Sequence, residues 1–185
     1  MILIVGLGNV GRQYKDTPHN AGFEFLNAYR NSLIEQGYIA DLWKNENMFQ
    51  SEICKIRKNG ELQFLLAKPT TYMNKSGEAV LKLVTKFLPD TVIIVHDDLD
   101  IKLGECKLQI GKGPKNHNGV LSIEKIKGSD KYIRIRIGVE GRVDKKTIPG
   151  DIYVIRRLDK QQIELLNESI FDGISLLNLQ INPKI

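Results

Sequence analysis

The sequence predicts an α/β fold in which a twisted, mixed β-sheet is flanked by helices within one domain spanning residues 1–185. Two observations predict this class: strand-like apolar runs alternate with amphipathic helical patterns along the chain, and no long linker, repeat or low-complexity tract interrupts them. The length of 185 residues and the hydrophobic fraction of 42% also match one domain with a sizeable core.

The first half of the chain divides by hydrophobic periodicity and turn residues. The opening run is continuously apolar, as expected of a strand covered on both faces. Thr17-Pro18 marks a helix start, and apolar residues then recur at helical spacing to a stop near Gly37. Asn59-Gly60 predicts a tight hairpin turn. The expected elements are therefore a strand over 1–7, a helix up to about residue 36, and hairpin strands over 51–56 and 62–67.

The second half repeats the alternation. A helical face runs from Ala79 to Phe87 and is ended by Pro89, after which an apolar strand leads into the acidic run HDDLD. Two segments then alternate like strands, and a final amphipathic helix closes the chain. The expected elements are a strand over 91–95, strands over 107–110 and 132–139, and a helix with apolar positions from 163 to 177.

Composition limits the class of partner and compartment. The formal net charge of +5 is compatible with a polyanionic partner. The two cysteines, Cys54 and Cys106, are too few for a disulfide framework and lack a metal-binding spacing, which favours a reducing compartment. No apolar run approaches the roughly 18 residues of a membrane span. We therefore expect a cytoplasmic protein with no membrane contact.

The opening stretch MILIVGLGNVG carries Gly6, Gly8 and Gly11 at the spacing of a dinucleotide-binding turn. That motif needs a helix that begins at the third glycine, so that its N–H groups meet the pyrophosphate. Here a polar loop follows Gly11, and the helix starts only near Pro18. The pattern therefore argues against a nicotinamide or flavin cofactor, and we expect the loop to bring Asn9, Tyr14 and His19 together beyond the end of the first strand.

Other polar residues follow predicted elements and could converge on the same place: Asn74, Asp97, His117 and Asn118. Each has a simpler interpretation. Asn74 and Asn118 could be helix caps, His19 could bond locally, and Asp97-Asp98-Leu99-Asp100 could be a solvated acidic turn or a Mg²⁺ site that holds phosphate.

Together, five segments resemble bacterial peptidyl-tRNA hydrolases from Ile2 to about Leu166. They are GLGNVGRQYKDTPHNAGF, KPTTYMNKSG, HDDLDIKLGE, the HNG of 117–119 and RIRIGVEG, in the order found in that family. The resemblance implies hydrolysis of the ester between a peptide and the 3′ end of tRNA, without a cofactor or metal. It also implies that the glycine loop delivers Asn9 to a catalytic pocket.

The resemblance assigns roles to individual residues. His19 matches the general base that activates water, and Asp97 matches the carboxylate that orients its ring. Asn74 and Asn118 match amides that position substrate and water, and Asn9 matches the asparagine that engages the peptide backbone. The groove for the peptide and the terminal adenosine is expected to include Tyr14, Tyr72 and Met73.

The same resemblance implies a basic surface for the tRNA acceptor stem. His117, Lys107 and Arg136 are expected to contact tRNA, and strand alternation allows Arg134 to share the face of Arg136. The chain departs from the family at Gln109, where a lysine is common, and in the loop GKGPKNHNG, where Lys112 or Lys115 could compensate.

Two other classes remain open at this stage: a non-catalytic RNA-binding protein of the same fold, and a metal-dependent phosphoesterase built on Asp97, Asp98 and Asp100. A monomer is expected, and the segment 139–150 is a candidate lid.

Overall fold

A computed structural model describes residues 1–111, 116–143 and 145–181. Within these residues the strands form one eight-stranded sheet, in which β2, β4, β5, β1, β6, β8 and β7 are neighbours in that order and β3 pairs with β4. The strands are β1 (Ile2–Gly6), β2 (Ile39–Ala40), β3 (Lys44–Glu46), β4 (Ser51–Lys58), β5 (Glu61–Pro69), β6 (Thr91–Lys102), β7 (Cys106–Ile110) and β8 (Ile133–Glu140). The helices are α1 (Ala21–Glu35), α2 (Ser76–Phe87), α3 (Asn118–Glu124), α4 (Gly150–Tyr153) and α5 (Lys160–Ile181).

The sheet is mixed, as predicted. β1 runs parallel to β5 and β6, and β8 runs parallel to β6. β4 and β7 are antiparallel to their neighbours β5 and β8. The hairpin turn between β4 and β5 lies at Asn59 and Gly60, whose φ angles of 53° and 83° are those of a two-residue turn that favours Asn-Gly.

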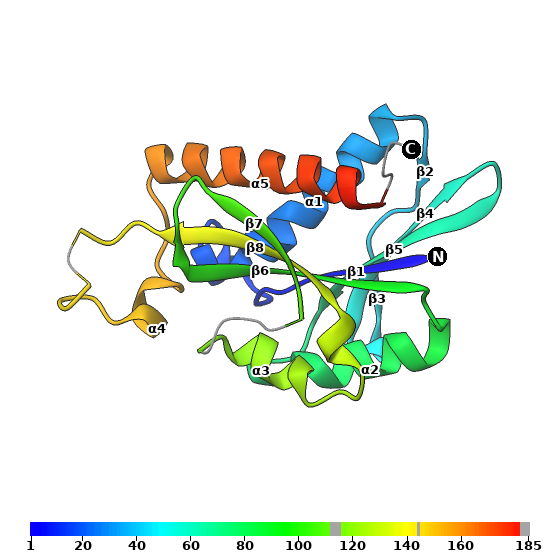
Figure 1. The fold of residues 1–185 in the computed structure, drawn as a ribbon, viewed down its shortest axis with the longest axis horizontal. Coiled ribbons are helices and arrows are strands. Elements are labelled where there is room, and N and C mark those ends of the chain that lie inside the picture. The colour runs from blue at the N-terminus through cyan, green and yellow to red at the C-terminus, as the bar shows by residue number, and fades with distance from the viewer. Residues whose placement is uncertain (112–115, 144, 182–185) are drawn as a thin grey trace.

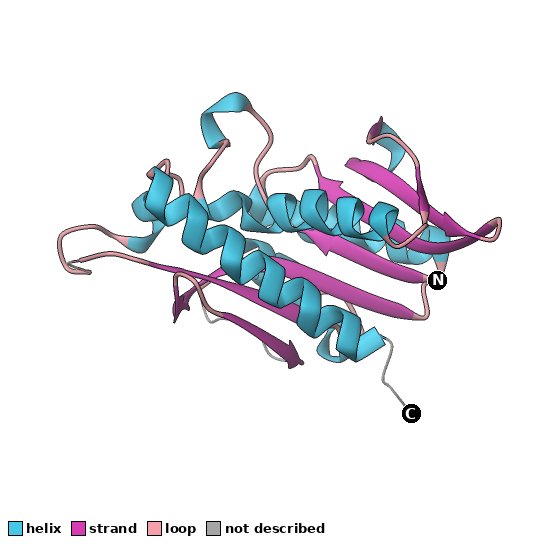
Figure 2. Ribbon diagram, turned by 90° about the horizontal axis from the view of Figure 1, so that it is seen from above, coloured by secondary structure: helices cyan, strands magenta, loops and turns pink. Residues whose placement is uncertain are grey.

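Helices cover both faces of the sheet (Figure 1). One core layer lies beneath α1 and α5, where Phe25, Leu26 and Ile170 pack on Ile4 and Ile93. Figure 2 shows these two helices side by side over the sheet. The opposite layer joins α2 and α3 to the alternate residues of the same central strands, including Leu3, Val5, Ile94, Val80 and Val120. Because β1 and β6 are buried on both faces, their sequences are continuously apolar rather than alternating.

The glycines of the opening motif allow close packing between β1 and α1. A Cβ atom on Gly6 would lie 2.2 Å from the carbonyl oxygen of Gly22, and one on Gly22 would lie 2.5 Å from backbone atoms of Leu7. Gly11 adopts a φ of 124°, which favours glycine. The first α-helix begins at Ala21, well after Gly11, so the chain lacks the helix start that a dinucleotide turn requires at the third glycine.

Candidate active site

The candidate site lies where β6 continues past the end of β1. Gly6, the last residue of β1, pairs with Val95, whereas β6 extends to Lys102. Asp97 therefore lies beyond the pairing with β1, at a point where groups from both helical layers can reach it. Its side chain is buried, with the residue only 2% exposed.

His19 approaches Asp97 from the layer of α1. It lies in a short 3-10 turn, Pro18–Asn20, that leads into α1, and its backbone N–H donates to the carbonyl of Val154 at 2.8 Å. The Nδ1 atom of His19 lies 2.8 Å from Oδ1 of Asp97. Since a carboxylate accepts, Nδ1 carries the proton and Nε2 is left as the basic nitrogen of the ring.

His117 approaches the same carboxylate oxygen from the layer of α3. Its Nε2 lies 2.8 Å from Oδ1 of Asp97. Its Nδ1 accepts hydrogen bonds from the backbone N–H groups of Gly119 and Val120, so His117 is the N-cap of α3. These amides fix the tautomer with the proton on Nε2, and one oxygen of Asp97 therefore accepts from two histidines.

The electrostatics of the pair follow from this geometry. Burial disfavours the charged ring of His19, but the negative charge and hydrogen bond of Asp97 outweigh it, so the pKa of His19 is raised above its ordinary value of 6.5. Burial alone would raise the pKa of Asp97, but the two histidine rings hold it far below its usual range. Asp97 is thus ionised, and it makes His19 a stronger base.

Asn9 is held beside this cluster by its backbone. Its N–H donates to Oδ1 of Asn20 at 2.7 Å, and its carbonyl accepts from Nδ2 of the same residue at 3.1 Å. Asn20 is buried at the start of α1. Asn9 lines two cavities.

The larger cavity has a volume of about 750 Å³ and contains the histidine cluster. Asn9, His19, Asp97, His117 and Asn118 line it, which brings five of the predicted site residues together. Segment 139–150 borders the same cavity through Arg142 and Lys145. Arg142 donates to the carboxylate of Glu140 and to the carbonyl of Ile148, and it thereby ties the two ends of this segment together.

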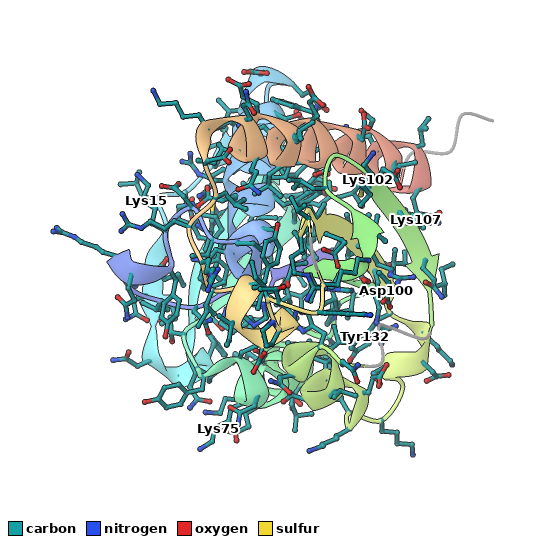
Figure 3. The ribbon with its side chains drawn as sticks, turned by 90° about the vertical axis from the view of Figure 1, so that its left-hand side faces the viewer. Lys15, Lys75, Asp100, Lys102, Lys107 and Tyr132 are labelled. Atoms are coloured by element: carbon teal, nitrogen blue, oxygen red, sulfur yellow. The ribbon has the colours of Figure 1, made fainter. Side chains whose placement is uncertain are left out.

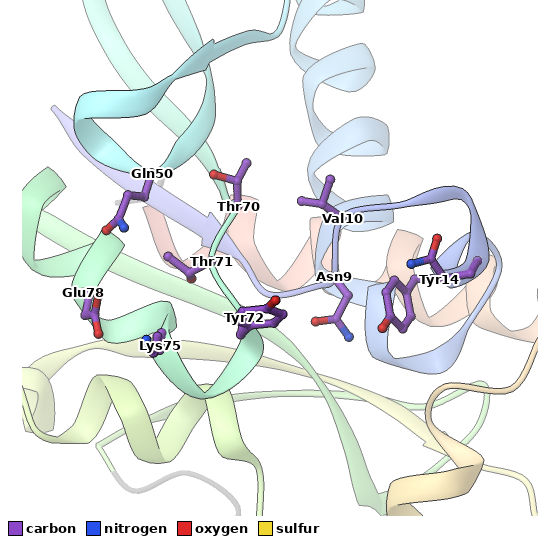
Figure 4. Close-up of a pocket in the computed structure, with 10 residues that line it drawn as sticks. Asn9, Val10, Tyr14, Gln50, Thr70, Thr71, Tyr72, Lys75 and Glu78 are labelled. Carbon is purple, nitrogen blue, oxygen red and sulfur yellow. The ribbon is translucent and has the colours of Figure 1, made fainter.

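The smaller cavity, of about 530 Å³, contains two predicted groove residues. Figure 4 shows Asn9 between Tyr14 and Tyr72, with Lys75 and Glu78 toward the far end. Tyr72 is 81% exposed. Met73 instead packs in the core, and its sulfur would lie 2.6 Å from a Cβ on Gly119. Met73 packs against α3 and lines neither of the described cavities.

Asn74 and Asn118 do not cap helices, contrary to the alternative interpretation of each. Lys75 is the N-cap of α2, without a side-chain cap, and His117 caps α3. Asn118 is the exposed first residue of α3 at the cavity. Asn74 is exposed in a 3-10 turn, Met73–Lys75, and does not line the larger cavity. The sequence missed the capping role of His117 because histidine is not among the preferred caps.

Of the three cations predicted to form a basic face, Lys107 is exposed, Arg136 is paired with an acid and Arg134 is buried. Lys107 is exposed and pairs directly with Arg136 across β7 and β8, on the side of the molecule that Figure 3 presents. Arg136 donates from Nε to Asp98 and from a terminal nitrogen to Gln109, at 2.7 and 2.6 Å. Arg134 is not available on this face: it is 1% exposed, and its guanidinium lies 3.7 Å from the carboxylate of Glu124 and donates to the carbonyl of Tyr132. Lys112, Pro114 and Lys115 lie outside the described residues.

The metal interpretation does not fit the donors. Both oxygens of Asp98 are engaged, one by Arg136 and one by the backbone N–H of Asp100. His19, Asp97 and His117 do offer three ligand atoms within 4.8 Å of one another. However, the two amides that donate to Nδ1 of His117 require the proton on its Nε2, the atom a metal would need bare. The cluster is arranged for hydrogen bonding.

Comparison with known proteins agrees with this arrangement. The sequence profile described as peptidyl-tRNA hydrolase matches residues 3–184. The chain belongs to the peptidyl-tRNA hydrolase family. A family member from Wolinella succinogenes is 38% identical over 173 residues, which cover 92% of this chain and 82% of that protein. One from Aliarcobacter butzleri is 38% identical, covering 96% and 90% of the two chains.

Solved structures of the family share the fold. The crystal structure of peptidyl-tRNA hydrolase from Acinetobacter baumannii superposes with a TM-score of 0.81 at 31% identity, covering 97% of this chain and 87% of that one. The mixed sheet flanked by helices is therefore the fold of the peptidyl-tRNA hydrolase family. In the described ranges, none of the helices combines the length and apolar character needed to cross a membrane.

Proposed function

We propose that this chain hydrolyses the ester bond between the peptide and the 3′ end of tRNA in peptidyl-tRNA, with His19 as general base and Asp97 as its orienting carboxylate. The family supports the activity. The observation that carries the residue assignment is the 2.8 Å hydrogen bond from Nδ1 of His19 to Asp97, made at the edge of a cavity that Asn9 and Asn118 share. It leaves Nε2 of His19 to take a proton from water.

The proposed reaction needs only groups of this chain and one water. Nε2 of His19 removes a proton as the water oxygen attacks the ester carbonyl, and the imidazolium that forms is stabilised by Asp97. The tetrahedral intermediate then collapses, its bond to the ribose oxygen breaks, and His19 returns the proton to that oxygen. The products are the free peptide acid and the tRNA with its terminal hydroxyl restored.

The asparagines supply donors for charge and position. In this proposal Asn118 donates to the developing oxyanion and Asn9 bonds the peptide backbone next to the ester, which is supported by the position of both residues in the lining of the larger cavity. Asn74, which is exposed two residues after Tyr72, is assigned to substrate that extends out of the larger cavity. Tyr14 and Tyr72 offer aromatic faces to the same substrate.

The partner in this proposal is the acceptor stem and 3′ end of tRNA together with its peptide. Lys107 is an exposed cation for backbone phosphates, and Arg136 lies opposite it with its charge paired to Asp98. We further propose that the chain acts as a single domain and a monomer in the cytoplasm, where its substrate is produced.

A hydrolysis assay tests the proposal. The wild-type protein should release tRNA from an N-blocked aminoacyl-tRNA with and without a chelator, and His19→Ala should lower kcat by about 10²- to 10⁴-fold, the usual effect of losing a general base. Filter binding of the blocked substrate should be nearly unchanged, because His19 is not a phosphate contact. A wild-type protein that binds but does not cleave would favour the non-catalytic RNA-binding alternative, and near-normal turnover of His19→Ala would remove this residue from the mechanism.

A further inference from the structure

The histidine cluster contains a third ring that the proposed reaction does not use. His96 precedes Asp97 on β6 and is 0% exposed. It lines neither of the described cavities, so it cannot touch substrate there. Burying the ring nitrogens of His96 costs free energy unless they form hydrogen bonds, and an apolar side chain would fill the same space without that cost.

One nitrogen of His96 forms a hydrogen bond with the backbone of Asp97, the carboxylate residue that both other histidines contact. Its Nδ1 lies 2.7 Å from the backbone carbonyl oxygen of Asp97. A carbonyl can only accept, so Nδ1 carries the proton and donates. This bond holds the peptide plane that follows Asp97, in a part of β6 that is paired with β8 and no longer with β1. The direction of the Asp97 side chain depends on that backbone.

The other nitrogen, Nε2, is buried and has no hydrogen-bond partner among the described residues. Burial, together with His117 and Arg136, lowers the pKa of His96 to about 3. The ring therefore stays neutral at physiological pH and keeps the single tautomer that donates to the Asp97 carbonyl.

The ring of His96 also contacts His117. The two ring centres are 5.1 Å apart at an interplanar angle of 67°, an edge-on contact, and the ring centre of His19 also lies 5.1 Å from that of His117. His117 thus contacts both other histidine rings while it donates to Asp97. Movement of His96 would be transmitted to Asp97 both through its backbone and through His117.

We propose that His96 is a positioning residue: by holding the carbonyl of Asp97 and bracing His117, it fixes the direction in which Asp97 presents its carboxylate to His19. The inference rests on the proposed function, because it assigns His96 a role in setting the basicity and orientation of His19. The sequence placed His96 inside the run HDDLD but gave no reason to separate it from a core residue.

Three substitutions separate the hydrogen bond from the ring. His96→Asn keeps an N–H donor near the position of Nδ1, whereas the leucine of His96→Leu has almost the same shape as asparagine but no donor. His96→Phe keeps a ring against His117 but cannot donate. We expect His96→Leu and His96→Phe to lower kcat by about 10- to 100-fold, as misplacement of a catalytic group does. KM should stay nearly unchanged, and His96→Asn should restore most of the turnover.

The second measurement does not depend on turnover. The titration of the His19 ring, followed by NMR in each folded variant, should move to lower pH in His96→Leu and His96→Phe, because a displaced Asp97 no longer raises the pKa of His19. In His96→Asn it should stay near the wild-type position. The kcat of each variant is calculated per folded molecule, with the folded fraction determined by circular dichroism.

Several results would overturn the inference. Full turnover of His96→Leu or His96→Phe would do so, as would an equal loss in all three variants with an unmoved His19 titration, which marks a role in packing alone. Failure of the proposed function is recognised separately, because it removes the activity of the wild-type protein while the His19 titration can still be compared.

Discussion

The shared oxygen of Asp97 leads to a prediction for His117. Because Nε2 of His117 and Nδ1 of His19 both donate to Oδ1, each hydrogen bond weakens the other. His117→Asn removes the donor to Asp97 but retains a side-chain oxygen of the kind that caps helices well, so α3 keeps its cap. The expected result is a stronger bond between Asp97 and His19, and a higher pKa for His19.

The magnitude follows from the energy of one hydrogen bond to a charged acceptor, about 1.5 to 3 kcal/mol. If about half of it is transferred to the remaining bond, the pKa of His19 rises by roughly 0.5 to 1 unit, since one unit corresponds to about 1.4 kcal/mol. His19 must be neutral to act as a base. The acid limb of the pH profile of kcat/KM should therefore move to higher pH by the same amount. The plateau above it should fall less than in the His96 variants, because His96 still holds the backbone of Asp97 when His117 is replaced.

The assay is cleavage of N-blocked aminoacyl-tRNA between about pH 5 and 9, with the His19 titration followed by NMR as an independent readout. His117→Ala is the matched control for the cap: it should show the same shift together with a loss of about 1 kcal/mol of stability. The alternative, in which His117 contacts tRNA, predicts a higher KM and an unmoved acid limb. That result, or a shift to lower pH, would refute the reasoning.

Three further predictions concern packing and the basic face. Gly22→Ala should lower the free energy of unfolding by about 1 to 3 kcal/mol in urea titrations, because the new Cβ would lie 2.5 Å from backbone atoms of Leu7. The gain in helix propensity from alanine is smaller than the cost of this close contact. Stability within about 0.5 kcal/mol of wild type would show that α1 can shift freely. Arg136→Ala should destabilise the fold by about 3 kcal/mol, because it leaves the buried Asp98 unpaired, whereas Lys107→Ala should leave stability unchanged and reduce the logarithmic salt dependence of KM by about 0.7 to 0.9. A Lys107→Ala variant with an unchanged salt dependence would exclude this residue as a phosphate contact.

The sequence by itself determined the order and type of the main elements. The double burial of β1 and β6 was visible as continuous apolar runs, and the turn between β4 and β5 was visible as Asn59-Gly60. These are local signals, because periodicity and turn chemistry depend on neighbouring residues. The sequence extended the central strand only to Val95, whereas β6 runs to Lys102, because polar residues at the end of a strand give no apolar pattern to follow.

The sequence also predicted that polar residues at element ends would converge, and His19 and Asp97 do meet at 2.8 Å. It could not determine how they are connected. His117 shares the oxygen of Asp97 because two helical layers meet beyond the end of β1. They bring together His19, which is 78 positions from Asp97 along the chain, and His117, which is 20 positions from it.

Only the tertiary structure decided which charged residues are available. Arg134 and Arg136 occupy equivalent positions in the alternation of β8, yet the first is buried near Glu124, while Asp98 and Gln109 hold the second. Strand alternation assigns a side chain to a face of the sheet, but the element packed on that face determines its burial and its partners. For the same reason His96, indistinguishable in sequence from a core residue, acquires its contacts with Asp97 and His117 only in the folded chain.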